Sequence, residues 1–180
     1  MKKLSVSAKL YLVFALAFLV AEYSRGGDLA IFMAASKALW EGKDIYTNTY
    51  YAGFHYLYSP LFAVLIHPLT VLPIAVSGTI WKALSFLMIA RTYWVMRRTF
   101  QLKEERIQLV LILSFLAVLL PIYSNTHLIQ LSAFLLWAIL ESLDLIFRRN
   151  MKVAGAALLA LVINIKLLPL AFLAYLIYRG

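Results

Sequence analysis

The sequence predicts an all-α protein, specifically a polytopic helical bundle in a membrane. Of its 180 residues, 64% are hydrophobic and 14% are charged, whereas a water-soluble domain carries about 25% charged and roughly half apolar residues. The mean hydropathy is +0.86, and several apolar stretches approach the roughly 20 residues that a membrane-spanning helix needs. These values exclude a soluble globular domain. The chain has no cysteine, which excludes disulfides, thiolate catalysis and zinc–thiolate sites.

The apolar stretches divide a single membrane domain, residues 1–180, into predicted spans and one outer loop. The predicted spans are 5–23, 60–73, 78–96, 107–123, 128–147, 153–165 and 167–178, and the outer loop is 24–59. The second stretch is short and contains three prolines. Because proline interrupts a helix, we expect this stretch to be short or re-entrant rather than an unbroken span. The first stretch resembles a signal peptide, but the later spans favour a retained anchor.

Basic residues predict which loops face the cytoplasm. Twelve of the 17 basic residues fall into four groups between the apolar stretches: Lys2, Lys3 and Lys9; Arg91, Arg97, Arg98, Lys103 and Arg106; Arg148, Arg149 and Lys152; and Arg179. Since cytoplasmic loops are enriched in Lys and Arg, we expect all four groups, and the N-terminus, on the cytoplasmic side. The second stretch must then leave and return on the outer side. The net charge of +9 reflects this topology, so we predict no nucleic-acid partner.

The outer loop contains a predicted helix over residues 29–41. Two glycines before it allow the chain to turn, and Gly42 can end it. Its mixture of apolar and polar residues suits a helix that lies in the membrane interface. Asp28, immediately before the helix, has two interpretations. It can be an ordinary N-cap, or a general base whose ionised form the helix N-terminus stabilises and which accepts a proton from a substrate hydroxyl.

Aromatic residues are concentrated in residues 46–58, which hold five tyrosines, Phe54 and His55. One interpretation is the aromatic belt that membrane proteins place at the interface. The other is a wall for a sugar ring or a prenyl chain, with apolar ring faces and phenolic hydrogen bonds. The density of aromatic residues does not distinguish the two.

Several short motifs follow one another in order along the chain. They are Asp28; Gly42 with Tyr46; Tyr58 with Pro60 and Phe62; Pro68 with Leu69; Leu72 with Pro73; and Ala154 and Gly155 followed by Lys166, Pro169 and Leu170. Together they resemble glycosyltransferase family 87, the polyprenol-phosphate-mannose-dependent mannosyltransferases of the GT-C superfamily. That family usually has a Gly-Gln-x-Asn step, where this chain keeps Gln130 but has Ile129 and Ser132. Family members are longer, so the resemblance is to their N-terminal half only.

The resemblance implies a GT-C-like fold and an inverting transfer of a sugar, mannose in the family. The donor would be a polyprenyl-phosphate sugar, and the acceptor a hydroxyl of a lipid or glycan at the outer membrane face. Such a transfer needs a base for the hydroxyl proton, and Asp28 fits both the position and the family pattern. The leaving phosphate needs positive charge or hydrogen-bond donors. Lys166 is the candidate, because an ammonium group within an apolar stretch is by default a functional hypothesis; its alternative is snorkelling at a helix end.

Four further residues are candidates for substrate binding: Tyr58, His55, His127 and Gln130. The last two lie one turn apart at the outer end of a predicted span, where the alternative is that they simply satisfy a helix end. We interpret Lys82, near the start of its predicted span, as snorkelling.

We predict no protein-held metal and no cofactor. His55 and His67 show no metal-ligand spacing with each other or with carboxylates. A divalent cation that bridges Asp28 or Asp44 to a phosphate stays open.

Two competing readings remain at this point. Asn164 and Lys166 beside Pro169 also suit a broken helix that lines a translocation path, so a non-enzymatic small transporter subunit or scaffold is one alternative. The other is a truncated or split transferase, with a second polypeptide supplying the missing spans. In each case the expected location is a bacterial or archaeal cell membrane, with the chain crossing it several times.

Overall fold

The computed structural model describes residues 6–23, 26–100, 113, 117 and 120–179. The regular secondary structure of these residues is helical, with no strand among them beyond one isolated bridge between Thr49 and His55. The helices are α1 (Val6–Ala21), α2 (Gly27–Trp40), α3 (Pro60–Ile66), α4 (Ile74–Phe100), α6 (Ser132–Leu143), α7 (Lys152–Ile165) and α8 (Ala171–Arg179). Short 3₁₀ turns cover Tyr51–Gly53, His67–Val71 and Leu168–Leu170, and a π-helical turn covers Asp144–Arg148. The prediction of an all-α protein is confirmed.

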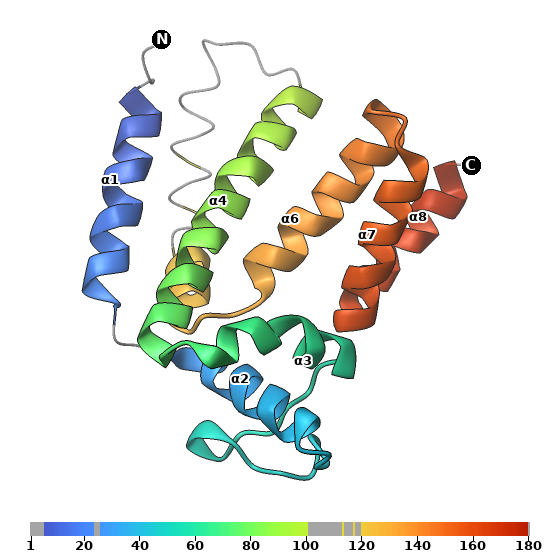
Figure 1. Cartoon of the computed structure of the whole chain (residues 1–180). Helices are drawn as coiled ribbons and strands as arrows, with labels where there is room; N and C mark the ends of the chain where they lie inside the picture. Colours follow the sequence, from blue (N-terminus) through green and yellow to red (C-terminus); the bar gives the residue numbers. More distant parts are fainter. Residues whose placement is uncertain (1–5, 24–25, 101–112, 114–116, 118–119, 180) are drawn as a thin grey trace.

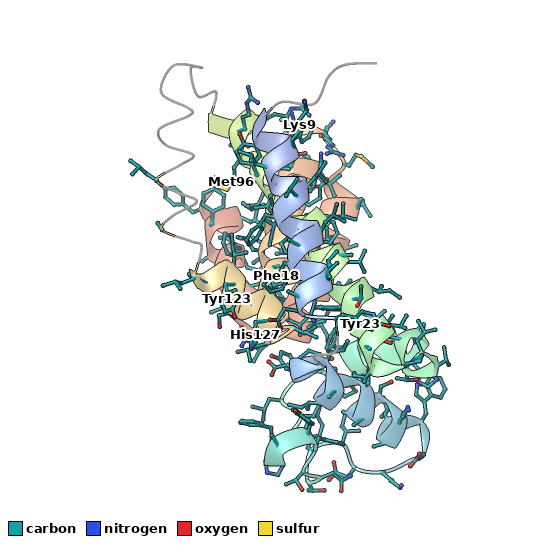
Figure 2. The ribbon with its side chains drawn as sticks, turned by 90° about the vertical axis from the view of Figure 1, so that its left-hand side faces the viewer. Lys9, Phe18, Tyr23, Met96, Tyr123 and His127 are labelled. Carbon is teal, nitrogen blue, oxygen red and sulfur yellow. The ribbon has the colours of Figure 1, made fainter. Side chains whose placement is uncertain are left out.

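The helices form two unequal parts (Figure 1). In the larger part α1, α4, α6 and α7 run side by side, and in the smaller part α2 and α3 lie across one end of them. Figure 2 shows Lys9 and Met96 towards one end of the larger part, and Tyr23 and His127 towards the end that meets α2 and α3. We refer to these as the far end and the site end of the bundle.

Length and composition identify one helix among the described residues that can cross a membrane, Ile74–Thr99. Leu120–His127 and Ser132–Arg148 meet the same criterion only when taken together, and they are bent by 113° at the break between them. Four shorter apolar helices accompany them: Lys9–Ala21, Pro60–Val71, Lys152–Ile165 and Leu168–Tyr178. The polytopic arrangement therefore stays a prediction.

Two of the predicted spans need separate comment. The span 107–123 falls mostly outside the described residues. The span 128–147 is not one straight helix, because residues 128–131 form the break before α6. Ile129 has a positive φ of 54° there, and the amide of Gln130 donates to the carbonyl of Asn125 at 2.9 Å. This is the geometry with which a helix commonly ends, although a glycine usually occupies the left-handed position.

The N-terminus of α2 is held against this break. The amide N–H of Asp28 donates to the carbonyl oxygen of Leu128 at 2.7 Å. Gly27 has a φ of +48°, and a Cβ atom added to it would lie 2.2 Å from the same oxygen. A glycine is therefore required here both by the backbone conformation and by the close approach.

The predicted helix over residues 29–41 is confirmed as α2, and its C-terminus ends as expected. Gly42 has a φ of +70°. Its amide donates to the carbonyl of Leu39 at 3.1 Å, and the amide of Lys43 donates to that of Ala38 at 2.9 Å. These two bonds form the Schellman motif that glycine favours.

Aromatic and aliphatic side chains join α2 to the rest of the chain. The ring of Phe32 lies 5.1 Å from the rings of both Tyr58 and Phe62, edge to face. The same hydrophobic core continues through Ala138 of α6 and Val162 of α7, both fully buried. The segment 60–73, which we expected to be short or re-entrant, forms α3 and the following 3₁₀ turn beside α2 (Figure 1).

Helices α6 and α7 approach each other closely at Gly155. A Cβ atom added there would lie 2.6 Å from Cγ1 of Ile146 and 2.7 Å from the carbonyl oxygen of Ser142. No other residue type fits this contact without a shift of the backbone.

The two glycines of α2 provide a test of the contact with Leu128. We expect Gly27→Ala to lower the free energy of unfolding by about 3 kcal/mol, since it combines a strained φ with overpacking. Gly42→Ala is the matched control, because Gly42 also has a positive φ but faces open space; it should cost about 1 kcal/mol. Unfolding of the two purified variants in detergent measures the difference, and equal losses would contradict the close approach at Gly27.

Candidate functional site

Asp28 lies in the first turn of α2 but does not cap it. The helix begins at Gly27, the N-cap position belongs to Gly26, and the structure gives no side-chain hydrogen bond there. The N-cap interpretation of Asp28 is therefore wrong, because the helix begins two residues earlier than expected, at Gly27 instead of Leu29. No described residue donates a hydrogen bond to the Asp28 carboxylate, so both of its oxygens can face a substrate. Partial burial raises the pKa of the Asp28 carboxyl.

Tyr58 lies close enough to Asp28 for the two groups to interact electrostatically. Burial, followed by the negative charge of Asp28, raises the pKa of the Tyr58 hydroxyl. The ring of Tyr58 is fixed by Phe32 at 5.1 Å and by Phe62 at 5.8 Å. The hydroxyl is thus a neutral hydrogen-bond donor beside a carboxylate.

Lys166 reaches the same place from α7. Its Nζ atom lies 5.7 Å from the centroid of the Tyr58 ring, within the range of a cation–π contact. Helix α7 ends at Ile165, and Lys166 is the extended, exposed residue that follows. This position corresponds to the alternative of a lysine at a helix end, between the predicted spans 153–165 and 167–178. The lysine lies at a helix C-terminus, where a positive charge is favoured, and its side chain extends over Tyr58.

A hydrogen bond between Ser59 and Asn164 brings these two segments together. Ser59 Oγ donates to Asn164 Oδ1 at 2.6 Å, and it accepts the amide of Leu61 at 3.0 Å, which caps α3. Sequence reasoning did not single out Ser59. A serine before a proline that opens an apolar helix is a recognisable N-cap signal. No local pattern in the sequence indicates that Asn164 is the hydrogen-bond partner of this serine.

His55 lies elsewhere, in the exposed loop between α2 and α3. Its Nδ1 atom is 3.1 Å from the carbonyl oxygen of Asn48, and the residue pairs with Thr49 in the isolated bridge. None of the contacts recorded among the described residues joins it to Asp28, Tyr58 or Lys166.

His127 lies just before the break that holds Asp28, and Gln130 lies within it. The His127 ring stacks on Tyr123, with centroids 5.4 Å apart (Figure 2), and its Nδ1 atom is 3.1 Å from a carboxylate oxygen of Glu22. The carbonyl of Gln130 accepts from Trp81 Nε1 at 3.4 Å. His127 thus faces α1, while Gln130 belongs to the segment that contacts the start of α2.

Lys82 does not snorkel. Its side chain is fully buried, and Nζ donates to the backbone carbonyl of Glu22. The prediction was wrong because the ammonium group finds its acceptor inside the bundle, beside the Glu22 and His127 pair. Sequence reasoning also missed Glu22, whose place at the end of an apolar stretch resembles an ordinary span boundary.

The two open grooves on α2 do not contain Asp28. One, of about 440 Å³, is lined by Gly26, Ala30, Met33, Ala34, Lys37, Tyr51 and Ile74. The other, of about 370 Å³, shares Ala34 and Lys37 with it. Asp28 and Phe32 are one turn apart, on a different face of the helix from this pair. We therefore place the candidate site by the chemistry of the Asp28 carboxylate and not by the size of a groove.

Asp44, the other carboxylate considered for a divalent cation, is occupied locally. Its oxygens accept the amide of Tyr46 at 2.9 Å and the hydroxyl of Thr47 at 3.0 Å. These hydrogen bonds lower the pKa of the Asp44 carboxyl. Within the described part of the chain, no three His, Asp or Glu side chains form a group that could hold a metal ion.

An all-helical chain that presents a half-buried carboxylate, a tyrosine and a lysine at one end of its bundle has the parts for a group transfer assisted by a base. Comparison with known families is more specific. Residues 56–180 match glycosyltransferase family 87. The match covers more than half of the chain, so the protein belongs to this membrane-associated family, which suggests that it is a glycosyltransferase. The matched range includes Tyr58 and Lys166 but not Asp28. No curated protein and no solved structure matches the chain.

The opposite pKa directions of Asp28 and Asp44 provide a test of the local electrostatics. Because burial raises the pKa of Asp28, the fold loses stability as pH rises through that pKa and the carboxyl ionises. We expect Asp28→Asn to raise the unfolding temperature at pH 7, and the gain to shrink below about pH 4, where the carboxyl is protonated in both states.

Asp44→Asn is the control, because the pKa of Asp44 is lowered and its ionised form is stabilised by folding. It should lower the unfolding temperature at pH 7. Thermal unfolding in detergent at both pH values measures these shifts. A destabilised Asp28→Asn variant at neutral pH would contradict the assignment.

Proposed function

We propose that this protein is a membrane glycosyltransferase that moves a sugar, with mannose favoured by the family, from a polyprenyl-phosphate donor to an acceptor hydroxyl at the outer membrane face, with inversion. The proposal rests on the Asp28 carboxylate, which does not cap α2 and lies near Tyr58, the residue that Lys166 contacts. The chain that presents these groups belongs to glycosyltransferase family 87.

The distribution of charge supports a polytopic, GT-C-like bundle with a cytoplasmic N-terminus. Lys9 lies at the far end of the bundle (Figure 2), and Arg97 and Arg98 occupy the last turn of α4, which ends there too (Figure 1). Helices α2 and α3 lie at the other end, so the enrichment of basic residues in cytoplasmic loops puts Asp28 on the outer side. The segment 60–73 would then lie at the outer interface without crossing.

The proposed reaction is a single displacement at the anomeric carbon of the sugar. Asp28 accepts the proton of the acceptor hydroxyl while the hydroxyl oxygen forms a bond to C1. The bond between C1 and the phosphate oxygen breaks, and the polyprenyl phosphate leaves with the electron pair. One displacement inverts the configuration at C1. A carboxylate whose pKa is raised by burial is a better proton acceptor than an ordinary aspartate.

Lys166 and Tyr58 have complementary roles towards the donor. The ammonium group and the phenolic hydroxyl can stabilise the negative charge that develops on the leaving phosphate. The half-buried ring of Tyr58, held by the buried rings of Phe32 and Phe62, offers an apolar surface for the sugar or the first prenyl unit. His127, Gln130 and His55 are weaker candidates for binding. A divalent cation, if one takes part, would bridge Asp28 to the phosphate.

The test is transfer of radiolabelled mannose from a prenyl-phosphate donor in native membranes, where any second polypeptide that supplies further spans is also present. We expect Asp28→Asn to lower the rate at least 100-fold, as loss of a general base does, without reducing membrane insertion. Asp44→Asn should retain the wild-type rate. Equal rates for wild type and Asp28→Asn would remove Asp28 as the base, and transfer by neither would favour a non-enzymatic transporter subunit or scaffold.

Lys166→Gln tests the phosphate contact separately from the base. We expect about a tenfold loss of transfer, the effect of one charge-assisted hydrogen bond. Lys37→Gln is matched to it in charge and lies in the grooves on α2 instead, so it should leave the rate unchanged. Similar rates for the two variants would show that Lys166 does not contact the donor.

A further inference from the structure

Three arginines lie around one tryptophan at the far end of the bundle, and a fourth is linked to them through shared carboxylates. The guanidinium carbon of Arg91 lies 4.4 Å from the Trp94 ring centroid, that of Arg98 lies 4.1 Å from it, and that of Arg148 lies 5.9 Å from it. Arg149 joins the group through Glu141 and Asp144. We call Arg91, Arg98, Arg148 and Arg149, together with Trp94, the arginine cluster.

Two carboxylates hold three of these arginines in place. Arg91 makes a two-pronged contact with Glu141 at 2.7 and 2.8 Å, and Arg148 and Arg149 both donate to Asp144. The side chain of Asp144 is only 1% exposed, so its charge is committed to these partners. The guanidinium groups are therefore fixed before any ligand arrives.

The π-helical turn explains why Asp144 has two arginine partners. In an α-helix, residues four apart face each other but residues five apart do not. Here the amide of Arg149 donates to the carbonyl of Asp144 at 3.1 Å, which is the i to i+5 bond of a π-helix. The wider turn brings Arg148 and Arg149 to the same carboxylate.

Positive charge is left over after this pairing. The cluster contains four guanidinium groups and two carboxylates, and Arg98 has no carboxylate partner among the described residues; the contact that the structure gives for it is the Trp94 ring. Each guanidinium carries five N–H donors, of which the carboxylates occupy two on each paired arginine. Stacking on a ring covers the face of Arg98 and leaves its N–H edge available. Such an edge matches the oxygens of a phosphate.

Exposed apolar side chains lie close in the sequence to two arginines of the cluster. Phe147 and Met151 are 52% and 51% exposed, and Val153 is 86% exposed; they flank Arg148 and Arg149 in the sequence. These apolar side chains would gain nothing from contact with a free inorganic anion. They would pack favourably against the acyl chains of a ligand that also carries a phosphate head group.

We propose that the arginine cluster is a binding site for the phosphate of an anionic phospholipid. The head would lie against the N–H edges of Arg98 and its neighbours, with Trp94 as the platform, and the chains would lie along the exposed apolar side chains. The site is separate from Asp28, at the opposite end of the bundle. The proposal rests on the membrane placement given above, but it does not depend on sugar transfer.

The test uses the purified full chain in detergent, titrated with phosphatidylglycerol while the unfolding temperature is recorded, since a ligand that binds the folded state raises it. We expect saturable stabilisation by phosphatidylglycerol and little by phosphatidylcholine. Arg98→Gln should weaken the apparent affinity about fivefold, the contribution of one cation at an anionic lipid surface. Trp94→Leu should weaken it as well, although it changes no charge. Arg97→Gln is the matched control, adjacent and equal in charge, and should retain the wild-type affinity.

Other outcomes overturn the proposal. Equal losses in the Arg97 and Arg98 variants, with Trp94→Leu at wild-type affinity, would indicate diffuse attraction instead of a site. If inorganic phosphate raised the unfolding temperature at the same concentrations as phosphatidylglycerol, the ligand of the cluster would be a free anion and not a lipid. Because Arg98→Gln leaves both carboxylates paired, its unfolding temperature without lipid should be that of wild type. A failed transfer assay together with specific lipid binding would overturn the proposed activity alone.

Discussion

The hydrogen bond from the amide of Asp28 to the carbonyl of Leu128 is the contact on which the candidate site depends. It attaches the first turn of α2 to the break before α6, and Gly27 allows the two backbones to meet because it has no side chain. The amide of Asp28 is satisfied by a backbone oxygen, and its carboxylate does not cap the helix. This close approach thus determines the position of the carboxylate, at the cost of a partly desolvated charge.

The sequence predicted the features that have local causes. Apolar content predicted helices, and Gly42 predicted the end of α2. The break at residues 128–131 was missed because Ile129 carries no turn signal, yet it adopts a left-handed φ of 54°. Family 87 usually has a glycine at this step, which would adopt that conformation without strain. In this chain the burial of Ile129, which is 1% exposed, offsets the strain. Lys82 was misjudged for a related reason, since its acceptor belongs to another helix.

The candidate site shows the same limit. Asp28, Tyr58 and Lys166 were each singled out from the sequence, but nothing in their spacing indicated that they meet. The bond between Ser59 and Asn164, residues 105 positions apart, brings two of them together, and only the folded chain reveals it. His55 and His127 carry equally suggestive side chains, yet local partners hold them elsewhere. Residue type identified candidates here, and long-range packing selected among them.

The π-helical turn at Asp144–Arg148 also has a geometric consequence at the opposite end of the bundle. It determines the rotation at which the chain enters α7, and the contact of Gly155 with Ser142 and Ile146 locks that rotation. Helix α7 continues from Gly155 to Ile165, the residue before Lys166, so the rotation set at Gly155 determines where the lysine leaves the helix. A change in the rotation of α7 at the far end of the bundle would therefore move Lys166 away from the ring of Tyr58 at the site end.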